Sequence, residues 1–87
     1  MIIRIYRLTR LSGDERRALI QTLRSRFRVR FSVRAFTVYI KENPRLIIVH
    51  AEFDDTLQIQ GEESDVETMR ASLGLLPSDQ FAELGNP

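Results

Sequence analysis

The chain has 87 residues, of which 43% are hydrophobic and 29% charged, and its formal net charge is +1. This composition is typical of one small globular domain and excludes the disordered class. Cysteine is absent, which excludes disulfides, thiolate metal ligands and cysteine nucleophiles.

The hydrophobic residues never form a run long enough for a membrane helix. The longest run is Leu46–Val49, whereas a membrane helix needs roughly 20 apolar residues. Arg4 interrupts the apolar start of the sequence, so we expect no signal peptide. These patterns predict a soluble cytoplasmic protein that does not bind membranes.

Charge is divided sharply between the two halves of the sequence. Residues 1–41 carry eleven Arg and Lys against two acidic residues, whereas residues 42–87 carry two Arg against ten acidic residues. Such a division indicates an anionic partner, or neutralisation within one fold or between two copies. Almost all the cations are arginine, which binds phosphate in a bidentate manner, although a GC-rich genome produces the same bias.

The first predicted element is a strand over residues 2–11, rich in isoleucine. Its alternation is imperfect because Arg4, Arg7 and Arg10 recur at every third position. Side chains of a strand alternate between its two faces, so we expect some of these arginines on the buried face or at its edge.

A helix is predicted next, over about residues 13–25. Ser12 and Glu15 have the spacing of a capping box, in which each side chain accepts a hydrogen bond from the other residue's backbone. Leu19, Ile20 and Leu23 lie on one side of this helix, which is therefore expected to pack on a sheet.

The central segment, Arg26–Lys41, reads RFRVRFSVRAFTVYIK and alternates with a change of phase. Apolar side chains occupy odd positions up to Val33 and even positions from Phe36 onward. One flat strand cannot bury both sets, because a shift of one residue turns every side chain over. We therefore expect a bulge or a tight turn near Ser32–Ala35, and both alternatives remain open.

Two more strands follow a turn signal at Asn43–Pro44. The first covers residues 45–53 and has wholly apolar odd positions. The second covers residues 56–60 and is expected to point Leu57 and Ile59 inward, with polar residues outward. The order predicts an antiparallel meander with one solvated face.

A second helix is expected to begin in a capping box formed by Ser64 and Glu67. Gly74 is the expected C-terminal cap, and Pro77 follows just beyond it. Residues 78–87 are expected to form a loosely docked tail.

Two amphipathic helices need one apolar sheet face to cover. The sequence therefore predicts an α+β fold: a two-layer, four- to five-stranded, mainly antiparallel sheet packed against two helices, in the order β-α-β-β-β-β-α. Residues 1–77 are assigned to a single domain and residues 78–87 to the tail.

This order resembles one half-repeat of the TATA-box-binding protein (TBP-like) fold, over most of residues 2–76. The matching segments are Asn43–Arg45 before a hydrophobic strand, the turn at Asp54–Asp55, and Gly61–Ser64 leading into the last helix. In that family the concave sheet face grips the minor groove, and pairs of phenylalanines wedge into base steps. This chain has one repeat, two aspartates in place of the family's glycine–lysine turn, and arginines on its expected outer face. The resemblance therefore implies the fold and not the TATA-binding role.

The candidate binding site is the outer face of the central segment, formed by basic and aromatic side chains. These are Arg26, Arg28, Arg30, Arg34, Tyr39 and Lys41. Alternating arginines on a strand lie about 7 Å apart, close to the phosphate spacing of a nucleic-acid strand, and Tyr39 offers a stacking surface. In the alternative interpretation this face is solvated and its arginines form surface ion pairs, each contributing only about 0–1 kcal/mol.

No catalytic or metal-binding constellation is recognisable. His50 is the only histidine, and only Glu52 projects from the same strand face as a second ligand. The acidic cluster over residues 62–67 complements the positive start of a helix and lacks the order of a calcium loop. We therefore expect a non-enzymatic protein with no catalytic residues, no metal site and no cofactor.

Two functions remain open for this binding module. The first is nucleic-acid binding, with Arg28, Arg30 and Arg34 contacting phosphates, and it requires an affinity that falls steeply with salt. The second is a protein–protein interaction or a regulatory subunit, including a homodimer joined through an exposed sheet edge or through complementary charge.

Overall fold

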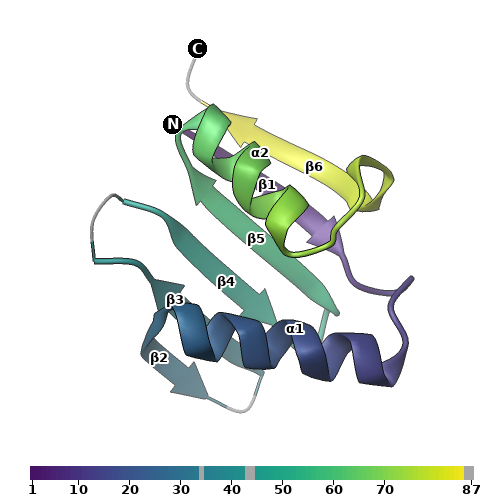
Figure 1. The fold of residues 1–87 in the computed structure, drawn as a ribbon. Helices are drawn as coiled ribbons and strands as arrows, with labels where there is room; N and C mark the ends of the chain where they lie inside the picture. Colours follow the sequence, from purple (N-terminus) through teal and green to yellow (C-terminus); the bar gives the residue numbers. More distant parts are fainter. Residues whose placement is uncertain (34, 43–44, 86–87) are drawn as a thin grey trace.

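The computed structural model describes residues 1–33, 35–42 and 45–85. Within these residues the chain forms six strands, two α-helices and one short 3-10 helix (Figure 1). The elements are β1 (Ile2–Arg7), α1 (Gly13–Arg26), β2 (Arg28–Val33), β3 (Phe36–Ile40), β4 (Ile47–Ala51), β5 (Thr56–Gly61), α2 (Glu63–Ser72), η1 (Pro77–Asp79) and β6 (Gln80–Gly85).

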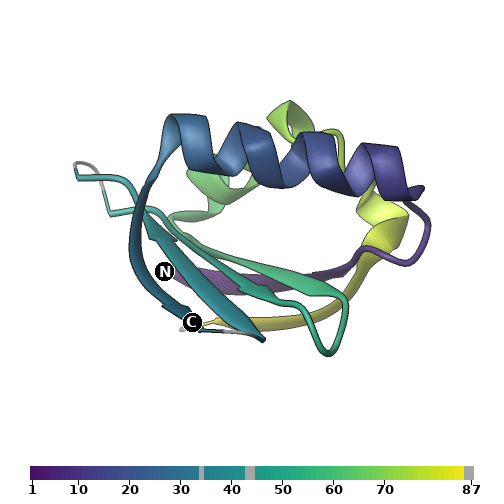
Figure 2. The same cartoon turned by 90° about the horizontal axis from the view of Figure 1, so that it is seen from below.

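The strands form one sheet in the order β2-β3-β4-β5-β1-β6, and every neighbouring pair is antiparallel. Both helices lie on the same side of this sheet (Figure 2). The predicted two-layer α+β class is confirmed, with six strands where four to five were expected. The additional strand is β6 at the C-terminal end.

Helix α1 begins where the sequence predicts. The Ser12 hydroxyl accepts a hydrogen bond from the Glu15 backbone N–H at 3.1 Å, and the Glu15 carboxylate accepts one from the Ser12 N–H at 2.9 Å. The hydrogen bond from the Ser12 backbone N–H lowers the pKa of Glu15, and the Ser12 side chain makes a smaller contribution in the same direction. The capping box is therefore confirmed, and it sets the register that buries Leu19 and Leu23.

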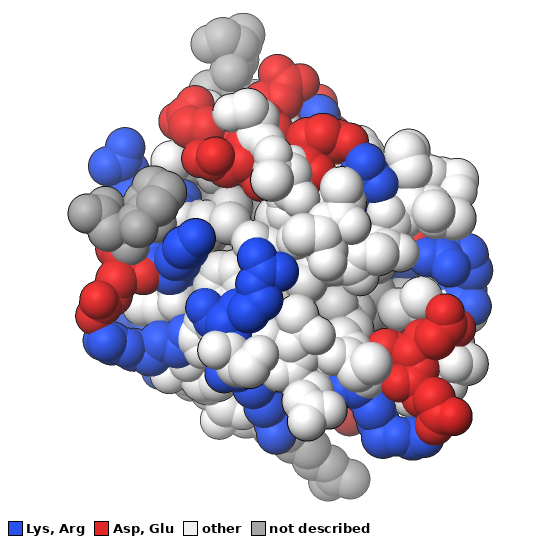
Figure 3. All heavy atoms as spheres, viewed as in Figure 1, with Lys and Arg blue, Asp and Glu red and all other residues white. Residues whose placement is uncertain are grey.

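Helix α2 begins differently from the prediction. It starts at Glu63, after an N-cap residue, Glu62, that makes no side-chain capping bond, so the expected capping box at Ser64 is wrong. Acidic side chains gather over α2 on the side drawn in Figure 3, where they complement the helix dipole. The predicted end is confirmed, because Gly74 adopts φ +75°, a left-handed conformation that favours glycine.

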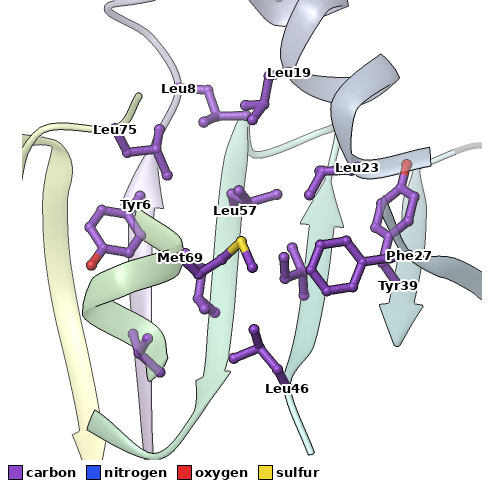
Figure 4. Packing of buried hydrophobic residues seen from close by; sticks show 13 residues of the cluster. Tyr6, Leu8, Leu19, Leu23, Phe27, Tyr39, Leu46, Leu57, Met69 and Leu75 are labelled. Carbon is purple, nitrogen blue, oxygen red and sulfur yellow. The ribbon is translucent and has the colours of Figure 1, made fainter. Parts of the chain in front are cut away.

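Between the helices and the sheet lies one hydrophobic core, to which every layer contributes (Figure 4). The strands supply Tyr6, Tyr39, Ile48, Leu57 and Ile59, all fully buried. The helices and loops supply the rest: Leu8, Leu19, Leu23, Phe27, Leu46, Val66, Met69 and Leu75. This core closes only one face of the sheet, the face under α1 and α2.

The C-terminal segment is part of the fold, so the expected loosely docked tail is wrong. Residues 80–85 pair with β1 as strand β6, while residues 86–87 lie outside the described residues. The Arg10 guanidinium donates to the Asp79 carboxylate at 2.9 Å and holds the pKa of that carboxyl below its usual value. The sequence pattern missed β6 because its stability depends on β1, a partner more than 70 residues away.

Arg4 lies on the helix-covered face, as the three-residue spacing of the arginines predicted. Its side chain is only 14% exposed and donates to Glu83 of β6 at 2.5 Å. It also pairs with Glu67 at 3.1 Å and Glu63 at 3.2 Å, both on α2. One buried cation therefore joins β1, α2 and β6.

The phase change in the central segment is resolved as two antiparallel strands, β2 and β3. Val33 pairs with Phe36, Ala35 has a turn conformation, and a register shift between Val29 and Phe31 adds a bulge within β2. The expected turn at Asn43–Pro44 lies outside the described residues, as does Arg34.

Substitution of Tyr39 separates the cost of its buried hydroxyl from the stabilisation that its ring provides. Its hydroxyl is buried, and within the described residues it has no hydrogen-bond partner. We expect Tyr39→Phe to leave the free energy of unfolding unchanged or to raise it by up to about 1 kcal/mol, because an unsatisfied buried hydroxyl is costly. Tyr39→Ala should lower it by about 3 kcal/mol or more, because it also removes the packed ring. Urea unfolding of both variants measures the two effects, and a large loss in Tyr39→Phe would show that the hydroxyl is hydrogen-bonded.

Candidate functional site: the open face of the sheet

No helix of the described residues covers the sheet face opposite α1 and α2, and strand registers identify the residues of this face. In β5, Leu57 and Ile59 point into the core, so the alternate residues Gln58 and Gln60 point to the other side. The register partners of these two glutamines are Val49 and Ile47 on β4, and Ile5 and Ile3 on β1. Continuing the pairing across the sheet gives the whole surface, here called the open face.

The open face is predominantly apolar. Its aliphatic residues in the middle strands are half-buried by their neighbours, while Phe31, Val33 and Leu84 near the two edges are 50%, 53% and 59% exposed. Phe31 also packs edge-to-face on Phe36, with ring centroids 6.5 Å apart. The full set is Ile3, Ile5, Arg7, Arg28, Phe31, Val33, Phe36, Val38, Ile40, Ile47, Val49, Ala51, Thr56, Gln58, Gln60, Ala82 and Leu84. Two of these, Ala51 and Thr56, are buried by their neighbours.

This surface reverses the orientation that the sequence suggested for the middle strands. Tyr39 was expected on the exposed arginine face as a stacking residue, and that prediction is wrong because its side chain is fully buried. Its register partner is Ile48, which continues the buried row under α1. Each of β3 and β4 is apolar at every position of one parity, and at the other parity one large residue, Tyr39 or Ile48, alternates with a polar one. Only packing against the helices selects which parity becomes the core.

The predicted row of basic residues is not assembled on one face. Arg26 is the last residue of α1 and donates to the Ser72 hydroxyl at 3.2 Å. Arg28 lies on β2 and pairs with Glu42 at 2.5 Å. Arg30 sits at the bulge of β2, and Lys41 follows the end of β3. Arg34 lies outside the described residues, so its predicted contact stays a prediction.

Several arginines of the basic half pair with acids of the acidic half inside one molecule. Arg4 and Arg10 make such pairs with α2, η1 and β6, and Arg16 of α1 pairs with Asp55 at 2.7 Å. The division of charge along the sequence is therefore partly neutralised within the fold. On the open face, Arg7 is engaged too, with its guanidinium carbon 4.3 Å from the centroid of the Phe81 ring.

A separate open groove of about 450 Å³ lies between α1 and the strands beneath it. Its lining combines apolar side chains with charged ones: Leu8, Arg16, Arg17, Ile20, Gln21, Arg24, His50, Glu52 and Asp55. Burial lowers the pKa of His50 below its ordinary value of 6.5, while the carboxylates of Glu52 and Asp55 oppose this shift. The imidazole is therefore neutral near pH 7.

The described part of the chain holds no cluster of three or more His, Cys, Asp or Glu that would bind a metal ion. Within residues 1–33, 35–42 and 45–85, no helix has the length and apolar character needed to cross a membrane. Comparisons with protein-family models, with curated proteins and with solved structures find no match for this chain. What the open face binds must therefore be inferred from its own chemistry.

His50 is the only histidine of the sequence, so its NMR titration reports on the groove without overlap from other imidazoles. We expect the His50 resonances to titrate with a midpoint below 6.5 in NMR spectra, because burial disfavours the imidazolium. Since the unfolded chain then binds the proton more readily, stability should decrease as the pH falls below about 6.5. Glu52→Gln should lower the midpoint further by removing a carboxylate that favours the cation, whereas Glu62→Gln at the start of α2 should not. A midpoint at or above 6.5 would show that the imidazole is solvated.

Proposed function

We propose that this chain is a non-enzymatic, cytoplasmic protein-interaction module, and that the open face is its binding surface. One observation supports this most strongly: a six-stranded sheet carries helices on one face and an uncovered apolar surface on the other. A contiguous apolar surface of this kind is rare on monomeric proteins and usually marks an interface. Apolar side chains there gain free energy only when another apolar surface removes them from water.

The chemistry of the open face favours a protein over a nucleic acid. Only Arg7 and Arg28 carry charge among its residues, and each is already engaged, by Phe81 and by Glu42 respectively. A phosphate-binding surface needs several free cations, because phosphate neutralisation supplies most nucleic-acid affinity. Aliphatic residues such as Val38, Val49 and Ile5 provide neither positive charge nor hydrogen-bond donors for a phosphate group.

The resemblance to a half-repeat of the TATA-box-binding protein fold is compatible with this assignment. In that family a sheet face, rather than a helix, contacts the partner. We extend only this feature to the present chain, as a proposal about which surface binds.

A photo-crosslinking experiment tests the proposed surface. Benzoylphenylalanine in place of Phe36 lies on the open face, and in place of Gln21 it lies on the exposed side of α1. In cells that contain the native partner, we expect irradiation to give one discrete protein adduct from position 36 and none from position 21. Equal labelling from both positions, or no adduct from position 36, would contradict the proposal.

Nucleic-acid binding stays as a second candidate because of the edge strand β2. Arg30 has no ion pair among the described residues, and half-exposed Phe31 follows it directly. A cation beside an exposed aromatic ring is the combination used for single-stranded nucleic acids.

This second candidate predicts a specific salt dependence. If β2 binds nucleic acid, fluorescence anisotropy with short random DNA and RNA should show affinity that falls steeply with salt and is lost in the Arg28→Ala/Arg30→Ala/Arg34→Ala variant. Arg17→Ala/Arg24→Ala/Arg45→Ala, at exposed positions outside β2, is the matched control that removes three charges elsewhere. The absence of binding at low salt would eliminate this candidate and leave the protein-interaction proposal intact.

A further inference from the structure

We infer that the partner of the open face is a second copy of this chain, packed sheet against sheet about a two-fold axis that runs along β5. This inference rests on the proposed interaction function and names its partner. It follows from the arrangement of polar and apolar columns on the open face and from the low charge of that face.

The open face contains one polar column, and this column is flanked on both sides by aliphatic ones. Gln58 and Gln60 project from β5, with isoleucine and valine of β4 on one side and isoleucines of β1 on the other. A glutamine amide both donates and accepts hydrogen bonds, so it can pair with an identical amide. A two-fold axis brings identical residues together only along the axis itself. The Gln60 amide already donates to the Met1 sulfur at 3.8 Å within its own chain, so Gln58 is the residue of the polar column whose amide the axis would satisfy.

A two-fold axis along β5 also matches the remaining columns. Such a rotation leaves each residue's position along the strand direction unchanged and exchanges the strands on the two sides of β5. Strand β4 of one copy therefore lies over β1 of the other copy, and β3 lies over β6. Because Val49 and Ile5 both pair with Gln58, Val49 of one copy faces Ile5 of the second. In the same way Ile47 faces Ile3, since both pair with Gln60.

The outer columns place apolar side chains opposite one another at both levels. Val38 pairs with Val49, and Ala82 pairs with Ile5, so the larger valine of β3 meets the small alanine of β6 in the second copy. At the next level Ile40 meets Leu84 by the same relation. Packed sheets lie about 10 Å apart and are rotated by about 30°, so these pairings hold best near the axis, at Gln58.

The low charge of the face suits a homodimer, and its small area requires complete coverage. Five overlapping strands, each about 4.8 Å wide and about 18 Å long, give a footprint of roughly 430 Å². This footprint is smaller than the roughly 800 Å² that a standard stable interface buries on each partner, so the whole face has to be covered. In the overlapping strands Arg7 is the one charged residue of the open face, and the net charge of +1 keeps the repulsion between copies small.

Charge substitution at Gln58 tests both the dimer and its axis. We expect the unaltered chain to sediment as a dimer at micromolar concentration in analytical ultracentrifugation. Gln58→Glu and Gln58→Lys each place two like charges face to face on the axis, so each should weaken dimerisation by at least about a hundredfold. An equimolar mixture of the two variants should restore a dimer, because each glutamate then meets a lysine of the other variant.

Matched controls separate charge from position. Gln21→Glu and Gln21→Lys on the exposed side of α1 should leave the dimer unchanged, and circular dichroism with thermal unfolding should show that all four variants fold. Dimers that persist in both Gln58 variants, or variants that stay monomeric when mixed, would overturn the axis along β5. A monomeric native chain would overturn the inference altogether.

Failure of this inference differs from failure of the proposed function. If the native chain is monomeric while position 36 still crosslinks to one discrete protein of another mass, the open face is an interface for a different partner. If position 36 gives no protein adduct and the chain is monomeric, both proposals fail.

Discussion

The structure depends on one constraint: every strand turns its side chains alternately to two faces, while both helices lie on the same face. In β3 and β4 large apolar residues occur at both parities, so the core can bury only some of them. Tyr39 and Ile48 enter the core under α1, and Val38 and Val49 remain outside on the open face. The uncovered apolar surface is therefore a direct consequence of how the hydrophobic core is closed.

Arginine has a different role in this molecule from the one that its clustering suggested. Arg4 is largely buried and joins β1 to α2 and β6, while Arg10 and Arg16 attach loops and helix to acidic residues far along the chain. These ion pairs join arginines of residues 1–41 to acidic residues of residues 42–87 within one molecule. They leave few free cations on the open face and shift its chemistry toward apolar contacts.

The two layers of the fold present separate surfaces. The groove that contains His50 opens on the helix side, between α1 and the strands, whereas the glutamines of β5 project from the opposite face. A second molecule seated on the open face would leave α1 and the groove accessible. Binding at the sheet and protonation of His50 are thus expected to be physically separate events, because the core lies between them.

The amino-acid sequence determined the features that depend on near neighbours. The capping box of α1, the glycine that ends α2, the inward Leu57 and Ile59, and the α+β class all follow from local spacing, since each rests on contacts within a few residues or on one periodicity. Tertiary structure alone decided the strand β6, the burial of Tyr39 and the dispersal of the arginines. Each of these depends on pairing or packing between distant segments, and a strand with large apolar residues on both faces does not specify by itself which face the helices will cover.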